Sequence, residues 1–216
     1  MRRFVLIPAT CLFLLCGTAA AASFDCARAA SRLEKLICAN PELSAQDETL
    51  NAAYRNALGR AADKAMLRRA QRNWLYSLDA GCADSLCVQD AFSERIRLLG
   101  SLAGSNVPGT NWTGHFVRYW KGREDTDSAS ITVLPLENGH LHLTGEALWL
   151  GPDGYEGQVA TGQMTGYATV QPDGTALFES EYCKARLRLR DDALEVSGES
   201  GCGGIRVTFN GDYRRQ

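Results

Sequence analysis

Six cysteines follow a short apolar leader, and they constrain the fold of this chain more than any other feature. Their number is even, and an exported protein enters an oxidising compartment, so three disulfides are expected. The positions are Cys26, Cys38, Cys82, Cys87, Cys183 and Cys202. The four in the first half allow three pairings, and spacing alone does not choose among them. The last two stand alone in the second half and are predicted to pair with each other.

These bonds would contribute substantially to stability. If Cys26 pairs with Cys38 and Cys82 with Cys87, each bond closes a short loop and stabilises by about 2–3 kcal/mol in the chain-entropy model. A bond between the last two cysteines closes a loop of about 20 residues and stabilises by about 3 kcal/mol in the same model.

The first 22 residues have the three parts of a secretory signal peptide. Arg2 and Arg3 supply the basic end, an apolar run occupies 4–16, and Ala22 closes a small-residue cleavage site. The run is shorter than the roughly 20 residues that a bilayer span needs. The bulky residues before Cys16 are unlike a lipidation site. We therefore expect cleavage after Ala22 and a periplasmic or secreted protein with neither a membrane span nor a lipid anchor.

The rest of the chain divides into two halves that differ in composition and in the pattern of apolar residues. Residues 23–100 carry short helical patterns rich in Ala, Leu and Arg, whereas residues 111–216 hold most of the glycines and alternate apolar with polar positions. The small and polar stretch 101–110 between them is typical of a linker. The sequence therefore predicts an α+β protein of two domains.

Four short helices are expected in the first half. Ser31 and Glu34 form a capping box that opens a helix, and Asn40-Pro41 ends it. A second helix is expected from about Ser44, with Asp47 completing its N-terminal signature. The third and fourth are expected over 63–78 and 85–99. Four short amphipathic helices bury little surface for each residue, so disulfides are expected to support them.

About eight antiparallel strands are expected in the second half. Asn138-Gly139, between two apolar runs, is a strong signal for a type I′ hairpin. The strands are expected over 111–120, 130–136, 141–148, 158–170, 176–182, 184–189, 193–196 and 205–213. So many short strands predict a small barrel or sandwich, and closure would remove exposed edges.

The charge balance argues against a nucleic-acid partner. The chain has 23 basic and 25 acidic residues, whereas a nucleic-acid binder shows a strong basic excess. Residues 23–100 hold 11 basic and 10 acidic residues, and residues 101–216 hold 10 and 15. The acidic second half either favours a basic partner through electrostatic steering or only aids solubility.

A row of like charge is predicted on the helical half. Arg60, Lys64, Arg68 and Arg72 stand four residues apart and share one face if the helix is continuous. Adjacent like charges repel, so an acidic neighbour would relieve them. That neighbour is water, the acidic second half or an external anion, and we favour the first two.

No catalytic motif is visible in the sequence. A nucleophile elbow, a P-loop, a dinucleotide fingerprint and a zinc-protease motif are all missing. The cysteines are assigned to disulfides, which leaves no thiol nucleophile. His140 and His142 would share a strand face, but no third metal ligand accompanies them. We therefore expect no enzyme, no cofactor and no metal.

A longer pattern runs through the helical half. It consists of Phe24-Asp25-Cys26, Glu34, Ile37-Cys38, Leu43 to Asp47, Leu50, Tyr54-Arg55, Gln71-Arg72-Asn73-Trp74, Asp79, Cys82, Cys87 and Arg95-Ile96. Over about 23–100 the chain resembles the LprI-type lysozyme inhibitor N-terminal domain, a family of exported helical modules held by cysteines. The resemblance implies a small helical domain of the bacterial envelope, with lysozyme inhibition as the named activity. It gives no inhibitory residue. The stretch from Cys183 to Arg214 looks like the β-rich module that often follows this domain.

Two functions are consistent with these features. The first is an inhibitor that binds lysozyme, with its acidic side chains facing a basic enzyme and a basic loop entering the acidic cleft. Candidate acidic contacts are Glu124, Asp125, Asp127, Glu179 and Glu181, and candidate cleft residues are Lys121 and Arg123. The alternative is an envelope module whose β half binds a small apolar ligand, a glycan or another protein. Trp112, Trp120 and Trp149 would line its mouth, unless they belong to the core.

Overall fold

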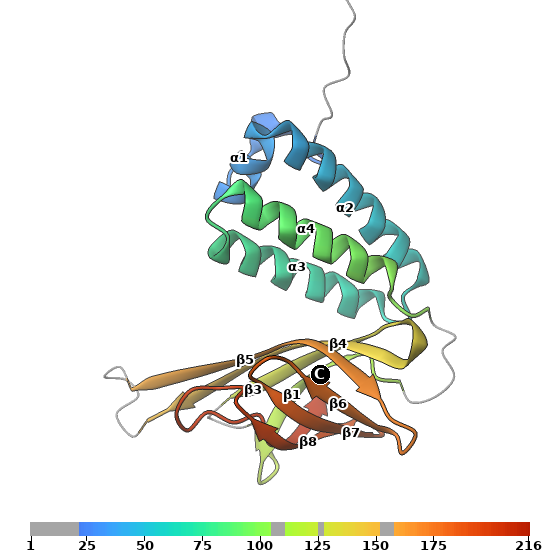
Figure 1. Ribbon diagram of the computed structural model, residues 1–216, viewed down its shortest axis with the longest axis vertical. Coiled ribbons are helices and arrows are strands. Elements are labelled where there is room, and N and C mark those ends of the chain that lie inside the picture. Colours follow the sequence, from blue (N-terminus) through green and yellow to red (C-terminus); the bar gives the residue numbers. More distant parts are fainter. Residues whose placement is uncertain (1–21, 105–110, 125–127, 152–157) are drawn as a thin grey trace, which may run out of the picture.

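The structure is a computed structural model that describes residues 22–104, 111–124, 128–151 and 158–216. A helical domain stands over a closed β-barrel (Figure 1). The helices are η1 (Cys26–Arg28), α1 (Arg32–Ala39), α2 (Pro41–Arg60), α3 (Lys64–Gly81), α4 (Ser85–Gly100) and η2 (Glu137–Gly139). The strands are β1 (Gly114–Trp120), β2 (Arg123–Glu124), β3 (Ala129–Pro135), β4 (His140–Leu150), β5 (Val159–Val170), β6 (Thr175–Glu179), β7 (Lys184–Arg190), β8 (Ala193–Ser200) and β9 (Gly211–Arg215). The expected α+β fold is confirmed. Within the described ranges, no helix has the length and apolar character needed to cross a bilayer.

The first two helices begin at side-chain caps. Ser31 Oγ accepts from the Glu34 amide and the Glu34 carboxylate accepts from the Ser31 amide, so the predicted capping box opens α1. The second helix begins at Pro41, one turn before the predicted start. Asn40 caps it by accepting from the next two free amides, and proline suits a first helical position because its missing N–H is not needed there. Asn40-Pro41 therefore ends one helix and starts the next.

Two disulfides cross-link segments of the helical domain. Cys26 is bonded to Cys38, and Cys82 to Cys87. The helices enclose a core whose most deeply buried members are Leu43, Ala57, Leu67, Val88, Phe92 and Leu99.

The predicted basic row is divided between two helices. The chain leaves helical geometry after Arg60 and resumes it at Lys64, because Asp63 caps α3 by accepting from the Met66 amide. Arg60 instead donates to the carbonyls of Leu99 and Gly100 at the end of α4. Only Lys64, Arg68 and Arg72 therefore share a helix face.

The barrel closes because β1 pairs with strands on both sides. The strands follow one another from β3 to β9, and β1 pairs with both β3 and β9. Asn138 and Gly139 between β3 and β4 have φ of 62° and 76°, the two positive values that a type I′ turn needs. The predicted hairpin at this position is confirmed.

Alternate residues of the eight strands that close the barrel, β1 and β3 to β9, fill its interior. Fully buried side chains of these strands and of the loop before β9 are Phe116, Ile131, Leu143, Met164, Ala176, Leu187, Leu194, Phe209 and Tyr213. Cys183 and Cys202 are bonded to each other and lie in this core. Trp112 is also part of it, with 5% of its surface exposed, so this tryptophan is not at a mouth.

The last predicted strand is much shorter than expected. The sequence predicts 205–213, but β9 begins only at Gly211. Residues 203–207 instead run beside β5, where Gly203 bridges Gly162 and the Gly204 amide donates to the Thr161 carbonyl. The apolar alternation at Val207 and Phe209 reflects packing on the barrel and not strand pairing.

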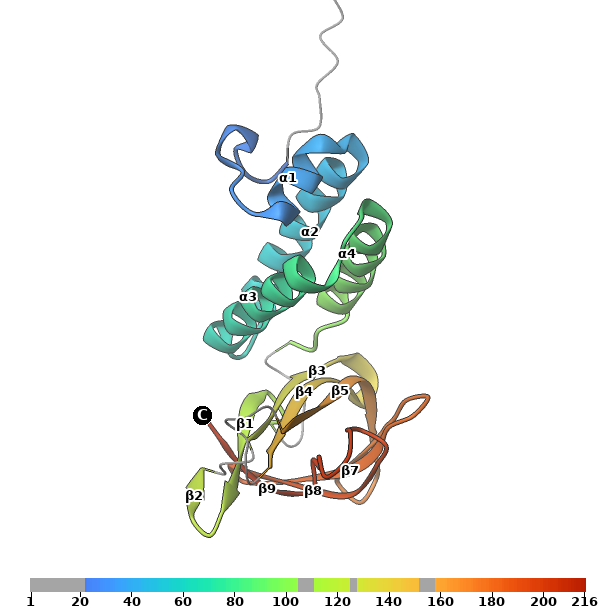
Figure 2. The ribbon, with the colours of Figure 1, turned by 90° about the vertical axis from the view of Figure 1, so that its left-hand side faces the viewer.

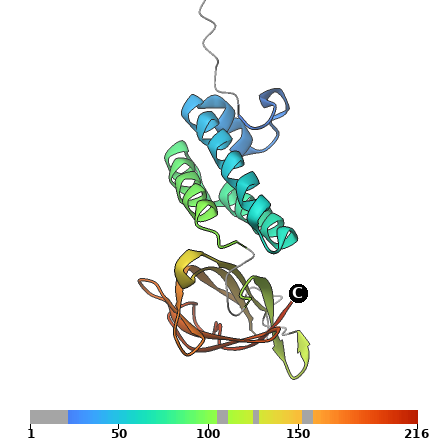
Figure 3. The same cartoon turned by 90° about the vertical axis from the view of Figure 1, so that its right-hand side faces the viewer.

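The helical domain rests on the outer face of β3, β4 and β5 (Figures 2 and 3). The side chains of Leu134 and Leu136 do not belong to the barrel core but are buried in the helical core. Tyr167 packs against the same helical core. After α4, Leu102 bridges Leu136, so the chain enters the barrel along this contact. The two domains therefore share a small apolar interface.

Candidate functional site

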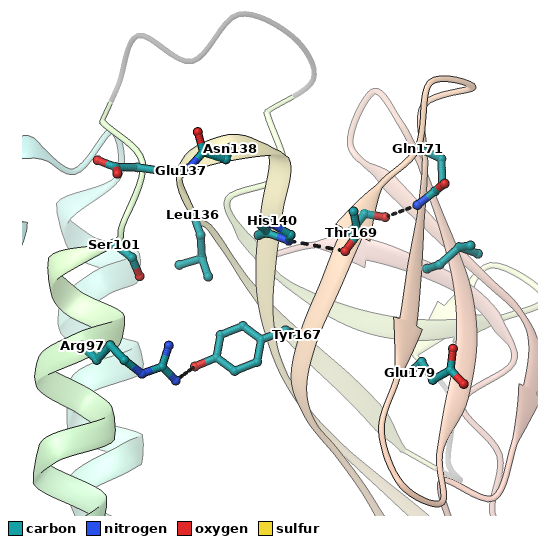
Figure 4. A pocket seen from close by; sticks show the side chains of 11 residues that line it. Arg97, Ser101, Leu136, Glu137, Asn138, His140, Tyr167, Thr169, Gln171 and Glu179 are labelled. Carbon is teal, nitrogen blue, oxygen red and sulfur yellow. Dashed lines mark hydrogen bonds between the residues drawn. The ribbon is translucent and has the colours of Figure 1, made fainter.

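A groove of about 770 Å³ opens where α4 meets the barrel (Figure 4). One wall is the C-terminal part of α4, and the other is the outer face of β4, β5 and β6. Its lining residues are Arg97, Ser101, Leu136, Glu137, Asn138, His140, Tyr167, Thr169, Gln171, Leu177 and Glu179. Nine of these eleven residues have polar or charged side chains, whose apolar parts also line the groove, so the groove suits an amphipathic ligand or a protein side chain.

Arg97 and Tyr167, which line the groove, form a hydrogen-bonded cluster with Glu94. Arg97 donates to Glu94 at 2.6 Å and to the Tyr167 hydroxyl at 2.8 Å, and Tyr167 donates to Glu94. Hydrogen bonds from Arg97 and Tyr167 lower the pKa of Glu94. Burial and the bond to Glu94 raise the pKa of Tyr167. The hydrogen bond and charge of Glu94 raise the pKa of Arg97.

His142 lies beside this cluster on β4. Its ring meets the Tyr167 ring edge-on, with 5.4 Å between ring centroids. Burial, with the positive charge of Arg95 as a second cause, lowers the pKa of His142 to about 4. At neutral pH His142 and Tyr167 are therefore neutral while Glu94 is charged. None of the three exchanges a proton near pH 7, so the cluster is suited to joining the domains and not to acid–base catalysis.

Arg95 is a buried cation of α4 without an acidic partner among the described residues. Its Nε donates to Gln71 Oε1 at 2.9 Å, and its guanidinium lies 5.2 Å from the centroid of the Trp74 ring. Its Nη2 is buried with no hydrogen-bond acceptor in the described part of the chain. Burial lowers the pKa of Arg95 to about 10, which leaves the group charged.

The predicted cleft residues lie on a different surface. Lys121 and Gly122 form the turn between β1 and β2, with φ of 49° and 80°, and Trp120 pairs with Arg123. Two positive φ values make a tight two-residue turn. The hairpin projects from the barrel on the side away from the helices (Figures 2 and 3). Lys121 and Arg123 are exposed there.

The described members of the predicted acidic set divide between β2 and the end of β6. Glu124 belongs to β2, and Asp125 and Asp127 lie outside the described residues. Glu179 lines the groove and pairs with Lys184 at 2.7 Å. Glu181 is exposed and accepts from the Tyr182 hydroxyl.

The structure also places Trp149 and the two histidines of the predicted strand. Trp149 on β4 is half-buried, and the Arg206 guanidinium lies 5.0 Å from the centroid of its ring. His140 and His142 do share a face of β4, but the described residues contain no cluster of three or more potential metal ligands.

Sequence reasoning missed the groove. Arg97 and Tyr167 are 70 positions apart, and neither belongs to a motif. The one available signal was the run of three polar or charged side chains Glu94, Arg95 and Arg97 beside the apolar stripe of α4, which does not indicate a partner.

The comparison with protein families matches the helical domain and the residues that follow it. Residues 26–107 match the model of a family described as Lysozyme inhibitor LprI. Lipoprotein LprI of Mycobacterium tuberculosis (strain ATCC 25618 / H37Rv) is 34% identical over 77 residues, which cover 34% of this chain and 39% of that protein. Lipoprotein LprI of Mycobacterium bovis (strain ATCC BAA-935 / AF2122/97) matches to the same extent. The chain thus spans about two-fifths of the length of these curated relatives. No solved structure matches significantly. The helical domain is LprI-like, and the barrel lies outside the match.

Proposed function

We propose that this chain is an exported protein of the bacterial envelope that binds lysozyme and blocks it without catalysing a reaction. The observation that carries the proposal is the match of residues 26–107 to a family named for lysozyme inhibition. All four cysteines of the helical domain are in disulfides, which is typical of exported proteins. The leader with its cleavage position after Ala22 supports the same location.

The chemistry of the described residues fits a binding role. Glu94, Tyr167 and His142, in or beside the groove, have pKa values displaced away from neutrality, and each contacts a neighbour of the same cluster. A protein inhibitor needs a rigid exposed surface and no reactive group. Disulfides in both domains supply that rigidity.

The barrel offers candidate contacts of both signs. Lys121 and Arg123 stand on the projecting hairpin and could enter an acidic cleft. Glu124 belongs to the same hairpin, Asp125 and Asp127 follow it in the sequence, and Glu179 and Glu181 lie at and just after the end of β6. An acidic surface would accelerate encounter with a basic lysozyme.

The test is lysis of a bacterial suspension by lysozyme in the presence of a molar excess of the purified mature protein. The proposal predicts slower lysis with at least one major lysozyme class and a direct complex in titration calorimetry. Lysis at the control rate for every class would refute it. The reduced and alkylated protein is the control, because it has the same sequence without its disulfides.

A glycan-binding module is the second candidate, favoured by the polar lining of the groove at α4. It predicts that tyrosine fluorescence or chemical shifts at Tyr167 change with peptidoglycan fragments and not with lysozyme. A filled barrel interior argues against an apolar ligand there.

A further inference from the structure

We propose that the surface that meets the acidic cleft of lysozyme is the exposed face of α3, and not the hairpin of the barrel. This inference rests on the proposed function. We call the three cations Lys64, Arg68 and Arg72 the α3 basic face. All three are exposed, and four-residue spacing on a helix rising 1.5 Å per residue places neighbours about 6 Å apart along one side.

The α3 basic face has no internal counter-charge. None of its three side chains has an ion pair or hydrogen bond with another residue in the described ranges. The two nearby acids have other partners: Asp63 accepts from the Met66 amide, and Asp79 accepts from the Leu33 amide. The acidic barrel, which the sequence analysis favoured as the neighbour together with water, supplies no ion pair to these cations from its described residues.

Helix stability does not account for these cations. The first turn of α3 contains no acidic residue, and Lys64, at its first position, faces the positive end of the helix dipole. Like charges four residues apart repel as well. Local features that oppose the fold are expected at functional surfaces, and here the missing group is an external anion.

Exposed large apolar and aromatic side chains follow on α3 and at the start of α4. Tyr76 is one further four-residue step along the row and is 81% exposed, and Leu75 beside it is 37% exposed. Leu86, in the first turn of α4 next to the bonded Cys87, is 71% exposed. Arginine and tyrosine side chains beside exposed apolar groups are the composition that protein interfaces favour.

The partner follows from charge and from the extent of the family match. Lysozyme is a glycosidase whose cleft carries a pair of carboxyl groups, and a row of cations complements it. The α3 basic face lies within residues 26–107, the only part of the chain that matches the lysozyme inhibitor family. The hairpin with Lys121 and Arg123 lies outside that match and projects from the side of the barrel away from the helices (Figure 2).

Another basic row provides a matched control. Lys184, Arg186, Arg188 and Arg190 alternate along β7 on the exposed outer face of the barrel. Its two ends are paired, Lys184 with Glu179 at 2.7 Å and Arg190 with Glu195 at 3.5 Å. Replacing Arg186 and Arg188 with glutamate changes the net charge by the same amount as replacing Arg68 and Arg72 with glutamate. The change lies on the barrel and not on the helical domain.

The experiment compares three double variants of the full mature chain: R68E/R72E, R186E/R188E and K121E/R123E. We expect R68E/R72E to raise the inhibition constant by about 30-fold or more, since it places acids against acids. R186E/R188E should change it by less than about threefold. The milder R68Q/R72Q, which removes the repulsion, should give an intermediate loss, and R68K/R72K should retain most of the inhibition.

The outcomes separate the inference from the proposed function. If the wild-type protein inhibits and R68E/R72E inhibits equally, the inference is wrong and the function stands. If K121E/R123E alone loses inhibition, the barrel hairpin is the contact and the inference is also wrong. If the wild-type protein inhibits no lysozyme, the function fails and the inference with it. Each variant must have the circular dichroism spectrum and the urea midpoint of the wild type before its inhibition is interpreted. If R68E/R72E does not, the inhibition constant of R68Q/R72Q tests the inference instead.

Discussion

The guanidinium of Arg97 in α4 donates a hydrogen bond of 2.8 Å to the hydroxyl of Tyr167 in β5. The same hydroxyl donates to Glu94 one turn earlier on α4. A single phenol oxygen therefore bridges a cation and an anion of the helical domain and ties both to the barrel. Around it the contact is small and apolar, formed by Leu102, Leu134 and Leu136.

Removing the Tyr167 hydroxyl should weaken the contact between the helical domain and the barrel. Tyr167→Phe keeps the ring that packs against the helical core but loses both hydrogen bonds. Glu94 and Arg97 are more than half exposed, so water replaces part of what is lost, and we expect a cost of about 1 kcal/mol in the free energy of unfolding. Urea denaturation followed by circular dichroism measures it.

The control for this variant is Tyr182→Phe. Tyr182 also donates from its hydroxyl to a carboxylate, that of Glu181, but it is exposed and makes no contact between the domains. It should change stability by less than about 0.5 kcal/mol. Equal effects of the two substitutions would mean that the Tyr167 hydroxyl does not hold the domains together.

His142 should make the protein less stable in mild acid. Its pKa in the folded protein is about 4, whereas an unfolded histidine titrates near 6.5. Between these values the unfolded state binds more protons, so stability falls as pH decreases from about 6.5 to about 4 and is unaffected above that window. The loss at pH 5 should be about 2 kcal/mol.

A neutral substitution isolates this effect. His142→Gln should lower the difference in unfolding free energy between pH 7 and pH 5 by about 2 kcal/mol, while other groups contribute equally to both proteins. His140→Gln, on the same face of β4 but exposed, should keep the wild-type pH dependence. Identical pH profiles for His142→Gln and the wild type would show that His142 is not buried as described.

Arg95 should be replaceable with a gain in stability. A buried charge without an acidic partner costs desolvation energy, and its apolar replacement is often neutral or stabilising. Arg95→Met combined with Gln71→Leu removes both partners of the 2.9 Å hydrogen bond. We expect the double variant to be more stable by about 1–4 kcal/mol in urea denaturation.

The single substitution Arg95→Met is the comparison. It leaves the Gln71 side-chain carbonyl without its donor, which costs about 1–3 kcal/mol, so it should be less stable than the double variant. A double variant clearly less stable than the wild type would indicate that Arg95 satisfies a group beyond Gln71 and Trp74.

Short sequence motifs correctly predicted the caps and turns that are formed by residues close together in the chain. The capping box at Ser31 and Glu34 and the turn at Asn138-Gly139 involve atoms within four residues of each other, and both are present. The start of α2 was wrong for an equally local reason: Asn40-Pro41 has the chemistry of a helix start as well as of a helix end. A stop signal and a start signal coincide there.

Contacts between segments far apart in the chain could not be predicted in this way. Arg60 looked like one member of a charged row, but it donates to the carbonyls at the end of α4, about 40 positions away. Glu179 looked like a solvent-exposed partner contact and lies in the groove at α4. Such placements follow from how two packed units meet, which periodicity within one segment does not encode.

The three disulfides should differ in their contribution to stability. In the chain-entropy model the contribution rises with loop length. Cys183–Cys202 spans 19 positions and Cys82–Cys87 only 5. Replacing the first pair with alanine should cost about 3 kcal/mol and replacing the second about 2 kcal/mol, in urea denaturation of each variant. A larger loss for the shorter loop would mean that strain or cavities dominate over chain entropy.

Cleavage after Ala22 should create a new ion pair inside the helical domain. The backbone nitrogen of Ser23 lies 2.7 Å from a carboxylate oxygen of Asp47, which is only 9% exposed. Processing at the predicted position turns this amide into an ammonium group, and a charged donor to a buried carboxylate forms a stronger bond. Asp47→Asn should therefore destabilise the mature chain by about 2 kcal/mol more than the chain that retains its leader. Urea denaturation of both forms with and without the substitution, after N-terminal sequencing, measures the difference. Equal losses in the two forms would show that the Ser23 ammonium group does not form an ion pair with Asp47.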